Sequence, residues 1–172
     1  MISVNALIAS AIGLYFFIIP AVLSIYYTND PALKSTQIPK LAIDMHERIT
    51  PQFEEWAKNR VDQKMGQQIS PDNISGTEWP FFSALYYLWT TETLIQDYKK
   101  RPSAYSNKPS SYSKKAIWAA VRLIADPSHA TWVKQKWGAN YLKKENVFYR
   151  AMLIAGMDSY YRLSGNDNFQ TC

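Results

Sequence analysis

The stretch TEWPFFSALYYLWTTETLIQDYKK, residues 77–100, determines the fold class that we expect. Pro80 falls in its first turn and Arg101-Pro102 follows its end, a pattern that predicts one long helix. Its aromatic residues point to all sides of such a helix, which predicts burial all round. These aromatic residues are Trp79, Phe81, Phe82, Tyr86, Tyr87, Trp89 and Tyr98. A helix of this kind must pack among other helices, so we expect an all-α protein.

Further helices are predicted on both sides of this stretch. Thr50-Pro51 has the form of a helix start, with threonine as the cap and proline in the first position, and apolar residues at helical spacing follow. No alternating strand pattern of useful length occurs. Short connections between successive helices predict antiparallel hairpins. Beyond a loop over 103–113, we expect helices over 114–125, 127–137 and 144–164, with Gly138 and Gly165 as stops.

The chain opens with ISVNALIASAIGLYFFIIPAVLSIYY, residues 2–27, which contains no charged residue and no histidine. About 20 apolar residues cross the hydrocarbon core of a bilayer as a helix, and Pro20 is tolerated there. We therefore divide the chain into a transmembrane anchor, 1–27, and a helical domain, 28–172. The alternative is a cleaved signal peptide, although no basic residue precedes the apolar run. We expect a single-pass protein of a bacterial inner membrane, and the lysines after the span favour a cytoplasmic domain.

Composition excludes several classes of protein. The chain has 172 residues, 47% of them hydrophobic and 15% aromatic, and a single cysteine, Cys172. One cysteine excludes an intramolecular disulfide and a four-thiolate zinc or iron–sulfur site, and the high apolar content excludes a disordered chain. The net charge is +5, but the basic residues are dispersed over helix ends and loops. We therefore expect solvated or lipid-facing lysines and no nucleic-acid partner.

The residues that could support chemistry are few. His46 and His129 have no partner pattern for a metal, so no metal site is predicted, and His129 is expected at a surface or capping position. Asp158 lies four residues before Arg162, a spacing typical of an ion pair. Glu92 lies between apolar residues with no cation four positions away. A carboxyl group in such surroundings either has a raised pKa, as in an acid–base site, or finds a partner elsewhere.

The segment WVKQKWGANYLKKENVFYRAMLIAGMDSYYRLSG, residues 132–165, resembles the linalool dehydratase-isomerase family. Members of that family carry a tryptophan-rich segment ending in glycine, then Lys-Glu-Asn, two apolar residues and a tyrosine, and then a long helix that ends in glycine. The matching residues are Lys144-Glu145-Asn146, Tyr149 and Gly165, and a looser similarity extends back to Thr77.

This resemblance implies part of an (α/α)6 toroid whose central cavity carries out acid–base chemistry on a terpene-like alcohol without a cofactor. It would make the chain, if active, a hydro-lyase and isomerase for a hydrophobic small molecule. Phe148 and Met152 stand where the family has a cavity methionine and a cavity histidine, and the family's cysteines have no counterpart. Because methionine cannot transfer a proton, we do not expect this chain alone to be competent for that reaction.

The candidate site follows from the same register. We expect Glu145 as the acid–base group with Tyr149 beside it, because 145, 148, 152 and 159 share one face of a helix over 144–164. The substrate-binding residues would be Phe148 and Met152, with Trp79 and Trp137 as aromatic walls.

Length limits how much of a ring the chain can form. Six helical hairpins need roughly 240 residues, so the chain supplies about half a toroid. We expect either a fragment of a longer product or a partial ring that another chain completes, as an oligomer or with the missing C-terminal half. Two other functions stay open: a non-enzymatic, membrane-tethered module that binds a partner or lipid, and a carbohydrate-active toroid fragment that uses Glu78 or Glu92.

Overall fold

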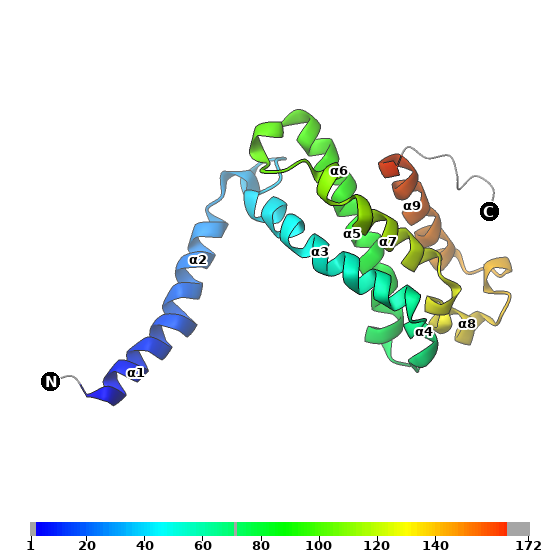
Figure 1. Cartoon of the computed structure of the whole chain (residues 1–172), viewed down its shortest axis with the longest axis horizontal. Helices are drawn as coiled ribbons and strands as arrows, with labels where there is room; N and C mark the ends of the chain where they lie inside the picture. The colour runs from blue at the N-terminus through cyan, green and yellow to red at the C-terminus, as the bar shows by residue number, and fades with distance from the viewer. Residues whose placement is uncertain (1–2, 71, 165–172) are drawn as a thin grey trace. The chain divides into compact units, whose positions relative to one another are not determined.

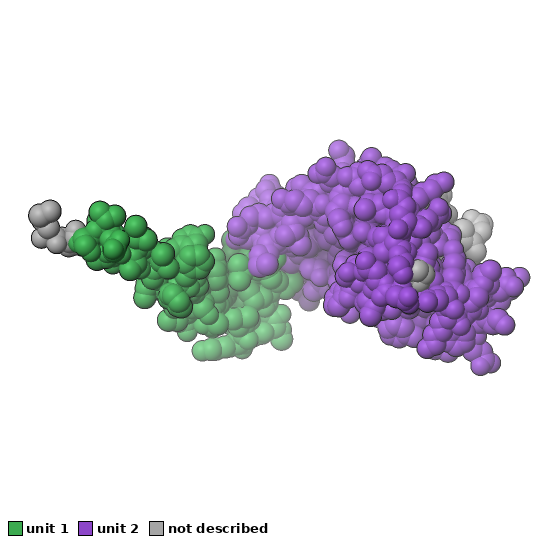
Figure 2. Space-filling view, turned by 90° about the horizontal axis from the view of Figure 1, so that it is seen from below, with its two compact units in different colours: residues 1–43 green, residues 44–172 purple. Residues whose placement is uncertain are grey.

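A computed structural model describes residues 3–70 and 72–164 of the chain. All its regular elements are helices, so the predicted all-α class is confirmed for these residues (Figure 1). The chain divides into two compact units, residues 1–43 and 44–172, which Figure 2 colours separately. Each unit is described by itself.

The first unit contains one long apolar helix. It consists of α1 (Val4–Gly13), a five-residue π-helical turn (Leu14–Ile18) and α2 (Ile19–Thr28), and it is followed by the short 3-10 helix η2 (Pro31–Lys34). Its residues are almost all exposed, and its mean hydropathy reaches 2.3. Pro20 cannot donate a backbone hydrogen bond, and just before it the amide of Ile19 bonds the carbonyl of Leu14, so the helix continues. The helix is long and apolar enough to cross a membrane, a property shared by anchors and signal sequences.

In the described residues, the second unit is built from α5 (Ile74–Lys100), α7 (Lys114–Ala125), α9 (Val147–Ser164) and all but the first four residues of α3 (Lys40–Asp62), with short helices at their connections. α5 contacts both α7 and α9, and α7 contacts α9. Successive long helices run in opposite directions, so α5 and α9 are parallel to each other, and α3 and α7 run the other way (Figure 1). Asp62 of α3 pairs with Arg122 of α7 at 2.9 Å. The bounds are α3 Lys40–Asp62, α4 Met65–Gln68, α5 Ile74–Lys100, η3 Pro102–Ala104, α6 Pro109–Tyr112, α7 Lys114–Ala125, η4 Pro127–His129, α8 Thr131–Trp137, η5 Tyr141–Lys143 and α9 Val147–Ser164.

The core of this unit lies where α5, α7 and α9 meet. α7 buries an almost continuous set of small and branched residues between Ala116 and Ile124. Gly156 of α9 is the point of closest approach, because a Cβ atom there would lie 3.0 Å from Leu85 and 3.1 Å from Ile124. A glycine at this position therefore lets α9 pack directly on the other two helices.

Several predicted boundaries are confirmed. The helix expected over 114–125 has the same limits in the structure, and α8 ends at Trp137 as expected. Gly138 follows with a φ of 78°, in the region that favours glycine. The expected loop over 103–113 contains two short helical turns, η3 and α6. Gly165 lies outside the described residues.

The predicted helix start at Thr50-Pro51 is wrong. α3 begins ten residues earlier, at Lys40, and Pro51 lies inside it. Thr50 is buried and does not cap the helix, because its hydroxyl donates to the carbonyl of His46 at 2.7 Å, four residues back. The hydroxyl also contacts the Tyr87 hydroxyl at 3.0 Å, so packing against α5 extends the helix across the proline.

Two further expectations need correction. α5 is not buried all round, since Trp79 and Tyr86 are more than half exposed. α9 starts at Val147 and not at residue 144, so Glu145 lies in the connection before the helix. Glu145 therefore does not share a helical face with Phe148 and Met152, and the register argument for it is wrong.

Candidate functional site

Exposed and half-buried aromatic side chains gather on the parallel pair of helices α5 and α9. Trp79, Phe82, Tyr86 and Trp89 recur every three or four residues along α5, and Phe148 projects from α9. Trp79, Tyr86 and Phe148 are 59%, 53% and 59% exposed. The Phe82 ring lies 6.1 Å from Phe148 and 6.4 Å from Tyr86, and Tyr86 lies 5.7 Å from Trp89. We call these five residues the aromatic face.

A second set of rings lies beneath Phe82 and Phe148. Tyr149 is buried and contacts Phe81 at 5.1 Å, Trp132 at 5.6 Å and Tyr141 at 5.7 Å between ring centroids. Burial raises the pKa of Tyr149, so its phenol stays protonated at neutral pH. Tyr149 therefore packs beneath the aromatic face. It could act as a base only if its pKa were lowered by a change in its buried surroundings.

Two nitrogen donors close to this buried layer have no partner among the described residues. They are Trp132 Nε1 and Asn146 Nδ2. The Trp132 ring contacts Tyr149, and the Asn146 amide oxygen accepts a hydrogen bond from the Tyr149 backbone at 3.3 Å. An unsatisfied buried donor costs free energy, so both groups would gain from an oxygen acceptor brought to them.

The structure brings together only part of the predicted site. Phe148 and Trp79 belong to the aromatic face, and Met152 is half-buried one turn after Phe148. Glu145 is exposed ahead of α9. Trp137 packs at the edge of the core, and no ring contact joins it to the aromatic face within the described part of the chain. The sequence analysis did not predict four further aromatic residues of this region, Phe82, Tyr86, Trp89 and Trp132. The spacing of positions 79, 82, 86 and 89 places them on one side of a helix and could have indicated three of the four.

Glu92 lies three residues beyond Trp89, and two side chains of α9 donate hydrogen bonds to its carboxylate. Arg162 Nε lies 2.5 Å from Glu92 Oε1, and the buried hydroxyl of Ser159 donates to Glu92 Oε2 at 2.8 Å. Arg162 also pairs with Asp158, as the spacing predicted. The hydrogen bond from Arg162 is the main cause that lowers the pKa of Glu92, so this carboxylate is ionised and its oxygens are occupied. Glu92 therefore joins α5 to α9 and is not a raised-pKa acid.

His46 sits in a buried polar network between α3, α5 and α6. Its Nε2 lies 2.9 Å from the Thr91 hydroxyl and its Nδ1 lies 2.9 Å from the Tyr112 hydroxyl. Since the Thr91 hydroxyl donates to the carbonyl of Tyr87 at 2.7 Å, it accepts from His46, which places the proton on Nε2. Burial lowers the pKa of His46 to about 4, so the ring is neutral at pH 7.

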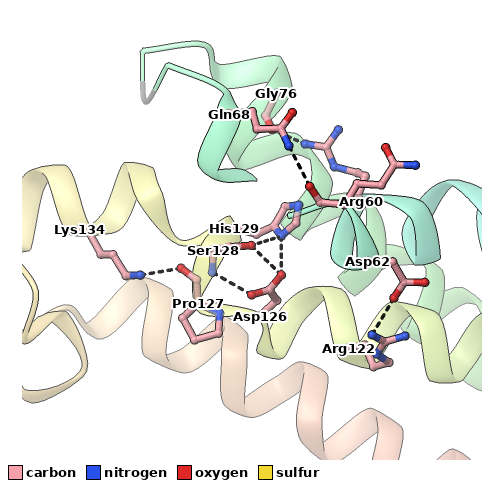
Figure 3. A network of polar contacts seen from close by, with 11 residues as sticks. Arg60, Asp62, Gln68, Gly76, Arg122, Asp126, Pro127, Ser128, His129 and Lys134 are labelled. Atoms are coloured by element: carbon pink, nitrogen blue, oxygen red, sulfur yellow. Dashed lines mark hydrogen bonds and ion pairs between the residues drawn. The ribbon is translucent and has the colours of Figure 1, made fainter. Parts of the chain in front are cut away.

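The turn at Asp126–His129 forms a third polar cluster (Figure 3). The prediction of a surface or capping position for His129 is wrong, because the side chain is buried. Its Nδ1 lies 3.2 Å from both the Ser128 hydroxyl and Asp126 Oδ2. Ser128 donates to Asp126 Oδ2 at 2.6 Å, so its hydroxyl is not poised on the imidazole as a nucleophile would be. Burial lowers the pKa of His129, and the cluster stabilises the turn between α7 and α8.

Among the residues described, no group of three or more histidine, cysteine, aspartate or glutamate side chains is arranged to hold a metal ion. Comparison of the chain with protein-family models, with curated proteins and with solved structures gave no match.

Proposed function

We propose that this chain is a membrane-anchored helical domain similar to the N-terminal part of the linalool dehydratase-isomerase family, and that its aromatic face forms one wall of a site for a terpene-like alcohol. The observation that carries the proposal is the set of exposed and half-buried rings that α5 and α9 share, in which Phe148, Phe82, Tyr86 and Trp89 contact one another in sequence. Aromatic rings offer apolar area to a hydrocarbon chain, and their faces stabilise a developing cation.

The order of the helices supports this interpretation. In an α/α toroid, each hairpin contributes one helix to an inner layer and one to an outer layer, and the helices within a layer run in the same direction. α5 and α9 are parallel neighbours and carry the aromatic face, whereas α3 and α7 run in the opposite direction (Figure 1). This arrangement fits an inner layer made of α5 and α9.

The polar atoms near the aromatic face suit an alcohol. Trp132 Nε1 and Asn146 Nδ2 are hydrogen-bond donors without partners in the described structure, and a hydroxyl oxygen is an acceptor. An apolar wall with a few polar groups beneath it is the usual composition of a small-molecule site.

The acid–base chemistry is not supplied by this face alone. Glu92 is held ionised by Arg162, and Tyr149 stays protonated because it is buried. We therefore propose that the chain binds the alcohol and that turnover requires the other half of a ring, from another copy or another chain. A non-enzymatic binding module is the second candidate, and the engagement of both Glu92 oxygens favours it.

A carbohydrate-active site using both Glu78 and Glu92 does not fit α5. At a rise of about 1.5 Å per residue, these two residues are about 21 Å apart along the helix axis. Glycoside hydrolysis needs two carboxyl groups about 5–10 Å apart.

The binding proposal is tested with two exposed residues of the aromatic face. In Tyr86→Ser/Phe148→Ser, we expect the affinity of the full chain for a monoterpene alcohol to fall about tenfold or more, because two of the three most exposed rings of the wall are lost. Titration calorimetry in nanodiscs, with empty nanodiscs as the blank, measures this affinity. Ile49→Ser, which removes an equally exposed apolar side chain from α3, is the matched control. Equal affinities for all three proteins would contradict the proposal.

A further inference from the structure

A groove lies on the second unit away from the residues of the aromatic face. It is lined by α3, α7 and α9 and has a volume of about 900 Å³, within the range of small-molecule sites. Its apolar lining comes from Ile117, Trp118, Tyr160 and Leu163. Trp118 is 50% exposed and its ring lies 6.1 Å from that of Tyr160, which is buried. One wall of the groove therefore offers an apolar strip whose main exposed member is Trp118, supported by the Tyr160 ring.

The charged lining of the groove is predominantly basic. Among the described lining residues, four are basic, Lys58, Lys114, Lys115 and Arg122, and one, Glu54, is acidic. Lys58 and Arg122 both pair with Asp62, at 2.8 and 2.9 Å. Lys114 and Lys115 have no ion pair among the described residues, so their charges are available to a ligand.

Helix stability does not account for the two available lysines. They occupy the first turn of α7, which contains no acidic residue. Positive charges at the N-terminal end of a helix are unfavourable because the helix dipole is positive there. The two lysines are therefore unfavourable for the helix itself. They lie beside an apolar strip, which an inorganic anion would not contact.

We propose that this groove binds one anionic phospholipid, with its phosphate at Lys114 and Lys115 and one acyl chain along Trp118 and Tyr160. The charge complementarity and the apolar strip select an amphiphile over a free anion. The chain also contains a helix long and apolar enough to cross a membrane, Val4–Thr28, and the proposal takes this helix to be a span. A tether of this kind raises the effective concentration of lipid near the domain.

The test is a lipid titration of the full chain in detergent, followed by native mass spectrometry. Short-chain phosphatidylglycerol and phosphatidylcholine are the probes, and inorganic phosphate and an acidic peptide are the competitors. We expect phosphatidylglycerol to bind about tenfold more tightly than phosphatidylcholine. In Lys114→Gln/Lys115→Gln this preference should disappear, because the exposed lysines contribute charge and little stability.

The matched control is Lys143→Gln/Lys144→Gln, which removes an exposed pair of consecutive lysines outside the groove. It should keep the preference for phosphatidylglycerol, and Trp118→Ala should weaken both lipids. An unchanged preference in Lys114→Gln/Lys115→Gln, or an equal loss in the control, would overturn the proposal. Displacement of the lipid by equimolar phosphate would assign a simple anion site instead, and displacement by the peptide would assign an acidic protein partner. These outcomes do not depend on whether the aromatic face binds an alcohol.

Discussion

Lowering the pH from 7 to 5 is expected to destabilise the second unit markedly, because His46 must take up a proton in a buried site. The native pKa is about 4, below the ordinary value of 6.5. Between these two values the unfolded chain binds more protons than the folded one, so the free energy of unfolding falls as the pH falls through this window. One pKa unit corresponds to about 1.4 kcal/mol, so the full loss by pH 4 is on the order of 3 kcal/mol.

The physical reason is the hydrogen bonding of both ring nitrogens. Protonation would place a second N–H on Nδ1, which now accepts from the Tyr112 hydroxyl, and Tyr112 would have to turn its proton away. The ring is also stacked on Tyr87, with centroids 5.0 Å apart, and is buried away from water.

Chemical denaturation at pH 7 and at pH 5 measures this effect. His46→Gln should lower the stability at pH 7 and flatten the dependence between the two values, whereas His129→Gln should leave the contribution of His46 in place. The pKa of His129 is also lowered by burial. Comparing the two variants therefore separates the contributions of His46 and His129 to the pH dependence of stability. A wild-type protein equally stable at pH 7 and pH 5 would contradict the account of the His46 network.

Gly66→Ala is expected to cost on the order of 3 kcal/mol, because α4 packs directly on the turn at Ser128. A Cβ atom at Gly66 would lie 2.4 Å from the carbonyl oxygen of Ser128 and 2.8 Å from its carbonyl carbon. Both atoms belong to the backbone, so the two segments must separate, and overpacking of this kind destabilises by about 1–3 kcal/mol or more. The separation would also disturb the neighbouring Asp126–His129 cluster shown in Figure 3.

Thermal unfolding followed by circular dichroism measures this cost in the full chain. Gly13→Ala is the control, because its added methyl group would meet no atom within 4 Å. We expect a much smaller change for the control. A Gly66→Ala protein as stable as the wild type would show that α4 does not hold the turn at this distance.

Local signals in the sequence predicted the helices whose ends depend on local chemistry. α7 ends where Asp126-Pro127 interrupts it, and α8 ends at a glycine with a φ of 78°. Thr50-Pro51 had the same kind of local signature, but tertiary contacts of Thr50 with α5 override it. The sequence does not show which group the Thr50 hydroxyl contacts. Without that contact, a proline in the first position of a helix cannot be distinguished from a proline within a helix.

The site was less predictable because it depends on contacts between distant segments. Glu92 and Arg162 are 70 residues apart, so no spacing rule relates them, and Glu92 was left without a partner. The burial of His129 follows from α3 and α4 packing above the turn, which a local sequence pattern does not reveal. The aromatic face could be predicted only in part. The spacing of positions 79, 82, 86 and 89 places these residues on one side of α5, but it does not indicate that this side stays exposed.

We propose that the rings on α5 and α9 contact a hydrophobic alcohol. Photoaffinity labelling of the full chain in nanodiscs tests this most directly, using a monoterpene alcohol that carries a diazirine, with the unlabelled alcohol as competitor. We predict competable labelling in residues 79–89 of α5 and around Phe148 of α9. Labelling confined to residues 4–28 of the apolar helix, or to α7, would contradict the claim.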